Sequence, residues 1–307
     1  MTEAIAFQGG AIHPSDGEYG EAALRHLQVG IDILKDGGPA LDAVVAVVSS
    51  AEDDPMFHAG TGARLNLKGE IEFDASVMDG ATFGAGAVGG IKRVKNPIRM
   101  AKAVMEETDH VLLVGSESEE IARKLGFEEY DAELPHRREE WKDLRAKIRR
   151  GEKMEGIHAY LKKIRKWADT VGACAVDNEG NFAAGTSSGG FPLKLPGRVG
   201  DVGIIGAATY AQNGAGSITL TGVGEIVIKT CLGYSIVQRM KAGQPAQEAA
   251  EDHLRDLNRR FGNPLMFVIC IDRDANIGTA RNVHLTPHAC WRGDWDAPKG
   301  NFAPVFE

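Results

Sequence analysis

Hydroxyl side chains set among glycines in the second half of the chain are the strongest candidates for chemistry. Thr170 follows an aspartate, and further hydroxyl groups lie in the blocks Gly185-Thr186-Ser187-Ser188-Gly189-Gly190 and Thr221-Gly222-Val223-Gly224-Glu225. A threonine hydroxyl is a poor nucleophile until a base removes its proton, and a free α-amine, with a pKa of about 7.7–8.0, suits that task. Thr170 would gain a free α-amine only through a cut directly before it. The alternative interpretation is that Thr170 simply begins a strand.

A charged pair in the block Leu195-Pro196-Gly197-Arg198-Val199-Gly200-Asp201 is the second candidate. The planar guanidinium of Arg198 matches a carboxylate in a two-point contact, and Asp201 can accept hydrogen bonds from an ammonium group. Together the two side chains would recognise the α-carboxylate and the α-ammonium of an amino acid. The alternative is an ordinary ion pair on the protein surface, which contributes little to stability.

The chain around these candidates reads mainly as β-strand after Thr170. Apolar runs predict strands over 171–176, 181–186, 204–209, 217–220, 265–272 and 277–283. Apolar residues at helical spacing predict a long helix over 225–241 and another over 244–261. The turn residues Asn178-Glu179-Gly180-Asn181 separate the first two strands.

The first half of the chain mixes strands with helices. A buried strand is predicted over 4–7, and two helices follow, one over 20–35 and one that opens at Pro39. Alternating residues around Lys68-Gly69 predict a hairpin over 63–76. The remaining elements predicted for this half are a glycine-rich strand over 83–94, a helix over 97–107, a strand over 110–114 and a helix capped by Ser116.

Residues 130–169 differ in character from the rest of the chain. Apolar residues recur every three or four positions among charges, which predicts amphipathic helix rather than an irregular linker. Residues 136–166 hold 12 Lys/Arg and 5 Asp/Glu, so this stretch carries +7 while the remainder of the chain carries −15. We interpret it as an amphipathic helix pair packed on its own acidic protein. The alternative is docking to a membrane or a nucleic acid.

Length and composition restrict the class of protein. The 307 residues, 43% of them hydrophobic, suffice for a large core, and the net charge of −8 argues against a general nucleic-acid binder. No run approaches the roughly 18 apolar residues of a membrane helix, and the first residues lack the pattern of a signal peptide. Four widely spaced cysteines predict neither a zinc site nor disulfides. We therefore expect a globular cytoplasmic protein that has neither a membrane nor a nucleic acid as partner.

The blocks around Thr170, Ser188, Arg198 and Thr221, in their order and spacing, resemble the plant-type asparaginase and isoaspartyl peptidase family of N-terminal-nucleophile hydrolases. The similarity continues into the first half, in Leu41-Asp42-Ala43-Val44, Glu52-Asp53-Asp54-Pro55 and Asp74-Ala75-Ser76-Val77-Met78-Asp79-Gly80. It spans most of the chain outside 130–168. The resemblance implies an α/β (α+β) fold, specifically a four-layer αββα sandwich formed by residues 1–307 as one domain, and a homodimer.

The resemblance also implies that the chain cuts itself. Thr170 would attack the carbonyl of Asp169, and water would open the resulting ester to leave Thr170 with a free α-amine. The products would be an α fragment, 1–169, which ends in the basic helical segment, and a β fragment, 170–307.

The other catalytic groups implied by the family are hydroxyl and backbone donors. Thr221 and the N–H of Gly222 would stabilise the oxyanion, where one good donor is typically worth about 2.7–4 kcal/mol. A glycine at 222 would equally suit a turn that needs its backbone angles. Ser188 stands where the family usually has threonine, beside the nucleophile, and it keeps the hydroxyl but loses the methyl group that restricts the rotamer.

Substrate and ion contacts are likewise implied by the resemblance. Arg198, Asp201, Gly224 and His58 would contact the substrate. No cofactor is required, but a structural sodium ion would be held by the backbone carbonyls of Ala51, Glu52, Asp54, Phe57, Ala59 and Thr61.

Besides Ser188, other positions depart from the family pattern. Gln8 stands where the family usually has histidine, and His58 replaces an asparagine that faces the active site. Imidazole is larger than an amide and titrates near neutrality, so we expect His58 to alter substrate choice or to slow self-cleavage; the alternative is a purely structural histidine.

The function that the resemblance implies is hydrolysis of the side-chain amide of L-asparagine, of β-aspartyl (isoaspartyl) dipeptides, or of both. The substrate would thus be a small amino acid or dipeptide. Two alternatives remain: a glycosylasparaginase-like hydrolase, and a catalytically silent chain that stays uncut and serves as a binding protein.

Overall fold

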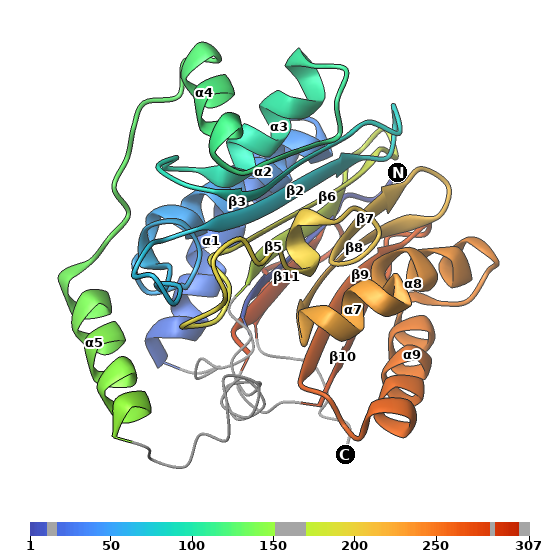
Figure 1. The fold of residues 1–307 in the computed structure, drawn as a ribbon. Coiled ribbons are helices and arrows are strands. Elements are labelled where there is room, and N and C mark those ends of the chain that lie inside the picture. The colour runs from blue at the N-terminus through green and yellow to red at the C-terminus, as the bar shows by residue number, and fades with distance from the viewer. Residues whose placement is uncertain (11–16, 151–169, 283–285, 301–307) are drawn as a thin grey trace.

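Two β-sheets lie face to face between two layers of helices (Figure 1). The computed structural model describes residues 1–10, 17–150, 170–282 and 286–300. Helices α1, α2 and α3 cover the outer face of the larger sheet, and α8 and α9 cover the smaller one. The expected αββα arrangement is therefore confirmed.

The larger sheet has eight strands in the order β12-β11-β1-β5-β6-β2-β3-β4. All neighbouring pairs are antiparallel except β3 and β4. Strands from before and after Thr170 are interleaved, since β1 lies between β11 and β5. The bounds are β1 Ala4–Gly9, β2 Phe73–Asp79, β3 Ala85–Ile91, β4 Leu112–Val114, β5 Val171–Val176, β6 Phe182–Ser188, β11 His288–Arg292 and β12 Lys299–Gly300.

The smaller sheet is wholly antiparallel, in the order β10-β9-β8-β7. Its strands are β7 Thr209–Gln212, β8 Gly216–Gly222, β9 Met266–Asp272 and β10 Ile277–Arg281. The helices are α1 Gly17–Lys35, α2 Ala40–Asp53, α3 Pro97–Glu107, α4 Ser116–Lys124, α5 Pro135–Arg149, α7 Gly224–Thr230, α8 Leu232–Lys241 and α9 Ala246–Phe261, with 3-10 turns η1 Gly60–Gly62 and η2 Asp201–Gly203.

Strand β5 shows how the layers share the core. Its six residues are all buried, because both faces of the sheet are covered. Alternate side chains go to different sides, since Cys174 belongs to the cluster between the sheets, whereas Ala173 and Ala175 pack with α1–α3. A strand covered on both faces reads as a continuous apolar run, which is why the sequence pattern located it.

Three predicted elements in the sequence differ from the structure. The strand over 204–209 is wrong: residue 204 is a bend, Ile205 makes only an isolated bridge to Thr209, residues 206–208 form a turn, and β7 begins at Thr209. The helix over 225–241 is two helices, because Cys231 adopts a left-handed conformation with φ 45° and ends α7. The expected hairpin over 63–76 has its turn at Gly69, φ 83°, but only β2 is a strand.

Smaller differences concern helix and strand ends. Gly115 is the N-cap of α4, and Ser116 is the first helical residue, where its hydroxyl donates to Glu117 instead of capping the helix. The last two strands of the larger sheet, β11 and β12, were not predicted. Short strands near a chain end carry too few alternating residues to stand out from loop.

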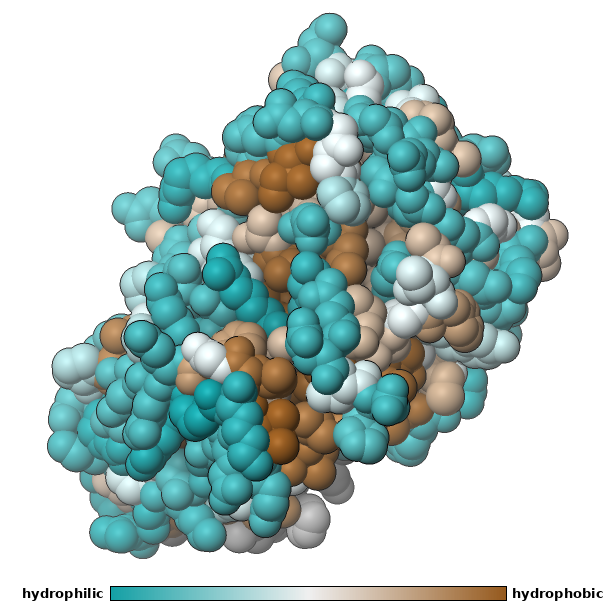
Figure 2. All heavy atoms as spheres, turned by 90° about the horizontal axis from the view of Figure 1, so that it is seen from above, coloured by the Kyte–Doolittle hydropathy of each residue, from teal (hydrophilic) through white to brown (hydrophobic). Residues whose placement is uncertain are grey.

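The face drawn in Figure 2 is mostly hydrophilic, with apolar side chains gathered in patches among polar ones. Exposed apolar residues include Val111, Leu112 and Val114, which lie in or beside the edge strand β4. In the part of the chain that the structure describes, no helix is long and apolar enough to span a membrane.

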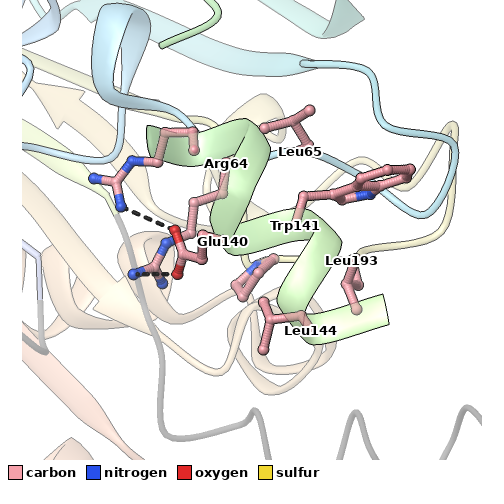
Figure 3. Close-up of a pocket in the computed structure, with 8 residues that line it drawn as sticks. Arg64, Leu65, Glu140, Trp141, Leu144 and Leu193 are labelled. Carbon is pink, nitrogen blue, oxygen red and sulfur yellow. Dashed lines mark hydrogen bonds and ion pairs between the residues drawn. The ribbon is translucent and has the colours of Figure 1, made fainter. Parts of the chain in front are cut away.

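Helix α5 confirms the amphipathic helix predicted within 130–169, and the part of the expected helix pair after residue 150 lies outside the described residues. Figure 3 shows Glu140 of α5 between two guanidinium groups, 3.3 Å from that of Arg64 and 3.1 Å from that of Arg137. Trp141 donates from its indole N–H to the carbonyl of Asn66 at 2.8 Å. The basic helix is therefore held mainly by carbonyls and a buried arginine of the 62–69 loop.

Candidate active site

Thr170 directly precedes β5 and is 7% exposed. The register of the β5–β6 pair matches Val171 with Ser187 and Gly172 with Thr186. Continuing this register by one residue brings Thr170 opposite Ser188, and side chains directly opposite on antiparallel strands have their Cβ atoms about 4.5–5.5 Å apart. The structure thus brings the expected nucleophile and the Ser188 hydroxyl together, while Asp169 lies outside the described residues.

The face of β5 that carries Gly172 is directed toward the second sheet. A Cβ atom on Gly172 would lie 2.0 Å from Oγ1 of Thr219, and the Ser217 hydroxyl donates to the carbonyl of Ala175 at 3.2 Å. Strand β8 therefore runs opposite to β5 across the gap between the sheets, and two residues further on it carries Thr221 toward Thr170. Three hydroxyl groups, on Thr170, Ser188 and Thr221, converge at this end of the sandwich.

Thr221 is suited to the role of an oxyanion donor. It is fully buried, and its Oγ1 has no hydrogen-bond partner among the described residues. A buried hydroxyl without a partner costs free energy, so its retention points to a partner that arrives with the substrate.

Gly222 is needed for close packing. A Cβ atom there would lie 2.5 Å from the sulfur of Met266 and 2.7 Å from the carbonyl oxygen of Leu265. Its φ is not among the positive values, so the alternative of a glycine kept for special backbone angles is wrong.

A chain of buried hydroxyls runs from this site across the sandwich, and the sequence analysis missed it. Oγ1 of Thr186 lies 3.2 Å from that of Thr219, Thr209 donates to Thr186 at 2.6 Å, and Ser76 donates to Thr209 at 2.8 Å. The signal was present in β8, where the buried residues Ser217, Thr219 and Thr221 alternate with apolar residues. Period-two hydroxyls in a core strand indicate a polar layer between the sheets.

Arg198, Asp201 and Gly224 converge beside the first group. A Cβ atom on Gly224 would lie 2.6 Å from Oδ1 of Asp201 and 2.8 Å from Nη2 of Arg198, so a side chain at this position would displace these two charged groups. The ion pair of Arg198 is with Glu225, at 3.0 Å, and its guanidinium lies over the ring of Phe191. Asp201 is 5% exposed, which excludes the alternative of a simple surface pair between Arg198 and Asp201.

Burial controls the charge of Asp201. Desolvation raises the pKa of its carboxyl to about 7, although the nearby Arg198 guanidinium acts in the opposite direction. Its Oδ2 atom has no hydrogen-bond partner among the described residues. A carboxylate in this condition gains most from an incoming ammonium group.

His58 and Gln8 border the same region. The carbonyl of His58 accepts a hydrogen bond from Gly189 at 3.1 Å, which joins the 58 loop to the residue after Ser188, and the His58 side chain is 4% exposed. Gln8 is fully buried, its Oε1 accepts from Gly10 at 3.0 Å, and its Nε2 points toward Gly172. Both departures from the family pattern are therefore positioned to affect the site.

The loop expected to hold sodium brings carbonyl oxygens against glycines. A Cβ atom would lie 2.4 Å from the Glu52 oxygen if placed on Gly60, and 1.6 Å from the Phe57 oxygen if placed on Gly62. Backbone oxygens are ligands that suit a hard cation. The described residues contain no cluster of His, Cys, Asp and Glu that could bind a metal.

The pocket drawn in Figure 3 lies elsewhere. It is lined by α5 and by the loops around Leu65 and Leu193, and none of the expected catalytic residues lines it. We interpret it as the seam where α5 meets the body of the protein.

Comparisons with known proteins agree with the geometry. Residues 1–296 match a family model described as asparaginase. A plant-type L-asparaginase of Thermococcus kodakarensis is 45% identical over 269 residues, which are 85% of this chain and 86% of that protein. Isoaspartyl peptidase/L-asparaginases of Xenopus laevis and Homo sapiens are 38% and 37% identical, with 85% and 82% of this chain and 84% and 81% of those proteins covered.

Proposed function

The chain belongs to the asparaginase family, and from this membership we propose that it is a threonine-nucleophile amidohydrolase that acts on L-asparagine, on β-aspartyl dipeptides, or on both. The observation that carries the proposal is the convergence of Thr170, Ser188 and the unpartnered Thr221 hydroxyl between the two sheets. The Arg198–Asp201 group beside them supports a substrate with a free amino-acid end.

Self-cleavage is the first step of the proposed mechanism. The Thr170 hydroxyl attacks the carbonyl carbon of Asp169, the C–N bond breaks as the C–O bond forms, and the nitrogen takes up the proton. Water then hydrolyses the ester, which leaves a carboxyl group on Asp169 and both a hydroxyl and an α-amine on Thr170.

Substrate hydrolysis repeats this chemistry on a side-chain amide. The α-amine of Thr170 takes the proton from Oγ1, which attacks the amide carbon, and Thr221 with the N–H of Gly222 stabilises the oxyanion. Ammonia or an amino-acid amine leaves with that proton, and water opens the aspartyl ester. Ser188 supports the nucleophile from the neighbouring strand.

Incubation of the purified protein followed by intact-mass measurement tests this function. We expect two fragments, 1–169 and 170–307, and release of ammonia from L-asparagine or of aspartate from β-aspartyl dipeptides. A chain that stays whole and releases neither product would make it a silent binding homologue. Hydrolysis of glycosylated asparagine in preference to both substrates would favour the glycosylasparaginase alternative.

Replacing His58 by asparagine is expected to change the ratio of asparaginase to isoaspartyl peptidase activity or the rate of self-cleavage, because the smaller amide restores the usual group at the loop that contacts Gly189. Both rates are measured on wild type and variant. His253→Asn is the control, since His253 bonds within α9 and lies outside the site. If the ratio and the cleavage rate both match wild type, His58 has a structural role only.

Binding of the product L-aspartate is expected to weaken as the pH falls through 7, because the pKa of Asp201 is raised to about 7 and the carboxylate form that attracts an ammonium group is lost below it. The inhibition constant should rise by up to about tenfold for each pH unit below 7. In Asp201→Asn the inhibition constant at pH 8 should be higher than in wild type. It should no longer rise as the pH falls through 7. An unchanged pH profile in that variant would assign the titration to another group.

We also propose a structural sodium ion, a homodimer and a cytoplasmic location. The carbonyls of Ala51, Glu52, Asp54, Phe57, Ala59 and Thr61 would hold the ion and so fix the loop that carries His58.

The exposed apolar residues at β4 support self-association, which light scattering tests. The four free cysteines support a reducing compartment.

A further inference from the structure

A buried charged cluster lies directly beneath the loop that carries Arg198. It consists of Glu72, Asp74 and Lys194, which are exposed by 4%, 1% and 0%. Charged side chains are seldom buried this completely unless they are paired and hydrogen-bonded. None of the three has a role in the reaction described above.

The two carboxylates bind the two ends of the loop 197–200, which carries Arg198 and which we call the substrate loop. Oε1 of Glu72 accepts a hydrogen bond from the N–H of Gly197 at 3.0 Å, and Oδ2 of Asp74 accepts from the N–H of Gly200 at 2.8 Å. These bonds fix the backbone on both sides of Arg198. Asp74 also binds the N–H of Gly90 at 2.9 Å, so it ties the loop to β2 and β3 at once.

Lys194 supplies the positive charge of the cluster and packs against Gly190, the residue that donates to Ser188. Its Nζ donates to the carbonyl of Glu72 at 2.9 Å. A Cβ atom on Gly190 would lie 2.9 Å from its Cδ, and Gly190 itself donates to the hydroxyl of Ser188. Burial lowers the pKa of Lys194, whereas the charges of Asp74 and Glu72 act to raise it.

We propose that Glu72 and Asp74, with Lys194 as their buried counter-charge, are positioning residues that set the geometry of the Arg198–Asp201 clamp and thereby the affinity for the amino-acid end of the substrate. This inference rests on the proposed function. It differs from a general role in folding because the two carboxylates bond to the N–H groups that flank Arg198, within 197–200.

Self-cleavage provides an internal reference for testing it. The bond between Asp169 and Thr170 is an ordinary peptide bond and presents no free α-carboxylate or α-ammonium to the clamp. A variant that disturbs only the clamp should therefore cut itself normally and bind substrate poorly. A variant that disturbs the whole site should both cut itself slowly and bind substrate weakly.

The test measures Asp74→Asn, in which one acceptor oxygen becomes an NH2 group that cannot accept a hydrogen bond, so the N–H of Gly200 or that of Gly90 loses its acceptor. We expect the KM for L-asparagine and the inhibition constant of L-aspartate to rise together, by about tenfold, the size of one lost hydrogen bond to a charged group. The kcat and the half-time of self-cleavage should stay within about twofold of wild type. Asp79→Asn is the matched control, because Asp79 binds the N–H groups of Ala81 and Thr82 at the far end of the same strand.

A second pair of variants covers the case in which Asp74→Asn does not fold. Glu72→Ala removes the acceptor for Gly197 and should raise both constants, whereas Glu72→Gln keeps an acceptor oxygen and should restore most of the affinity. A KM and an inhibition constant equal to those of wild type in Asp74→Asn and Glu72→Ala would overturn the proposal. Equal losses in self-cleavage and in substrate binding would overturn it as well. Wild-type protein without any hydrolytic activity would overturn the proposed function itself, and this inference with it.

Discussion

Thr170→Ala is expected to remain a single uncut chain and to lose at least about 10⁴-fold in the rate of ammonia release from L-asparagine, the scale on which removal of a nucleophile acts. Alanine has no hydroxyl to attack either Asp169 or a substrate, so both reactions fail at their first step. Intact-mass measurement and an ammonia assay, on the same preparation, follow the two losses.

Thr170→Ser and Thr82→Ala are the control variants for this experiment. Serine keeps the hydroxyl and should retain cleavage, because the chemistry needs only the oxygen. Thr82 is exposed just beyond the end of β2, so its replacement should change neither self-cleavage nor the rate of ammonia release. A Thr170→Ala chain that is still cut after residue 169 would place the nucleophile elsewhere.

Thr221→Val should lower kcat by about 10²–10³-fold in protein that has finished cutting itself, because valine keeps the shape of threonine but cannot donate to the oxyanion. The KM should change little, since the oxyanion forms after binding. The free energy of unfolding should not fall, because the Thr221 hydroxyl has no hydrogen-bond partner among the described residues.

Thr219→Val, two residues earlier on the same face of β8, should show the opposite behaviour. Its hydroxyl lies 3.2 Å from that of Thr186, so its loss should reduce the free energy of unfolding by about 1–3 kcal/mol. The effect on kcat should be much smaller than for Thr221→Val. Equal kcat losses in the two variants would show that the hydroxyl layer as a whole supports catalysis, and would contradict a special role for Thr221.

The sequence predicted most of the fold because most of its elements are locally marked. Helix α3 begins at Pro97 as expected, and the fully buried strand β5 appears as an apolar run. The failures are places where tertiary contacts override the pattern. Cys231 interrupts a helical apolar pattern with a left-handed residue, and residues 204–208 are apolar because they pack in or against the core between the sheets, without forming a strand.

The candidate site was predicted in part for a similar reason. Thr170, Arg198 and Thr221 stand in glycine-rich blocks whose residue types suggest chemistry directly. Which hydroxyl groups meet depends on strand register and on how two sheets pack, and neither is visible in a single strand. Glu72 and Lys194 were not singled out, because only the folded loop shows that both charged side chains are buried.

The interleaved order of the larger sheet has a consequence for the life of the mature enzyme. Once the chain is cut before Thr170, β1 belongs to one polypeptide and both of its neighbours, β5 and β11, belong to the other. Before the cut the protein refolds as one molecule; after it, unfolding lets two pieces diffuse apart, and recovery becomes a second-order, concentration-dependent encounter. If the chain cuts itself as proposed, unfolding followed by dilution would therefore be hard to reverse, and the lifetime of the cut form would depend on its unfolding rate.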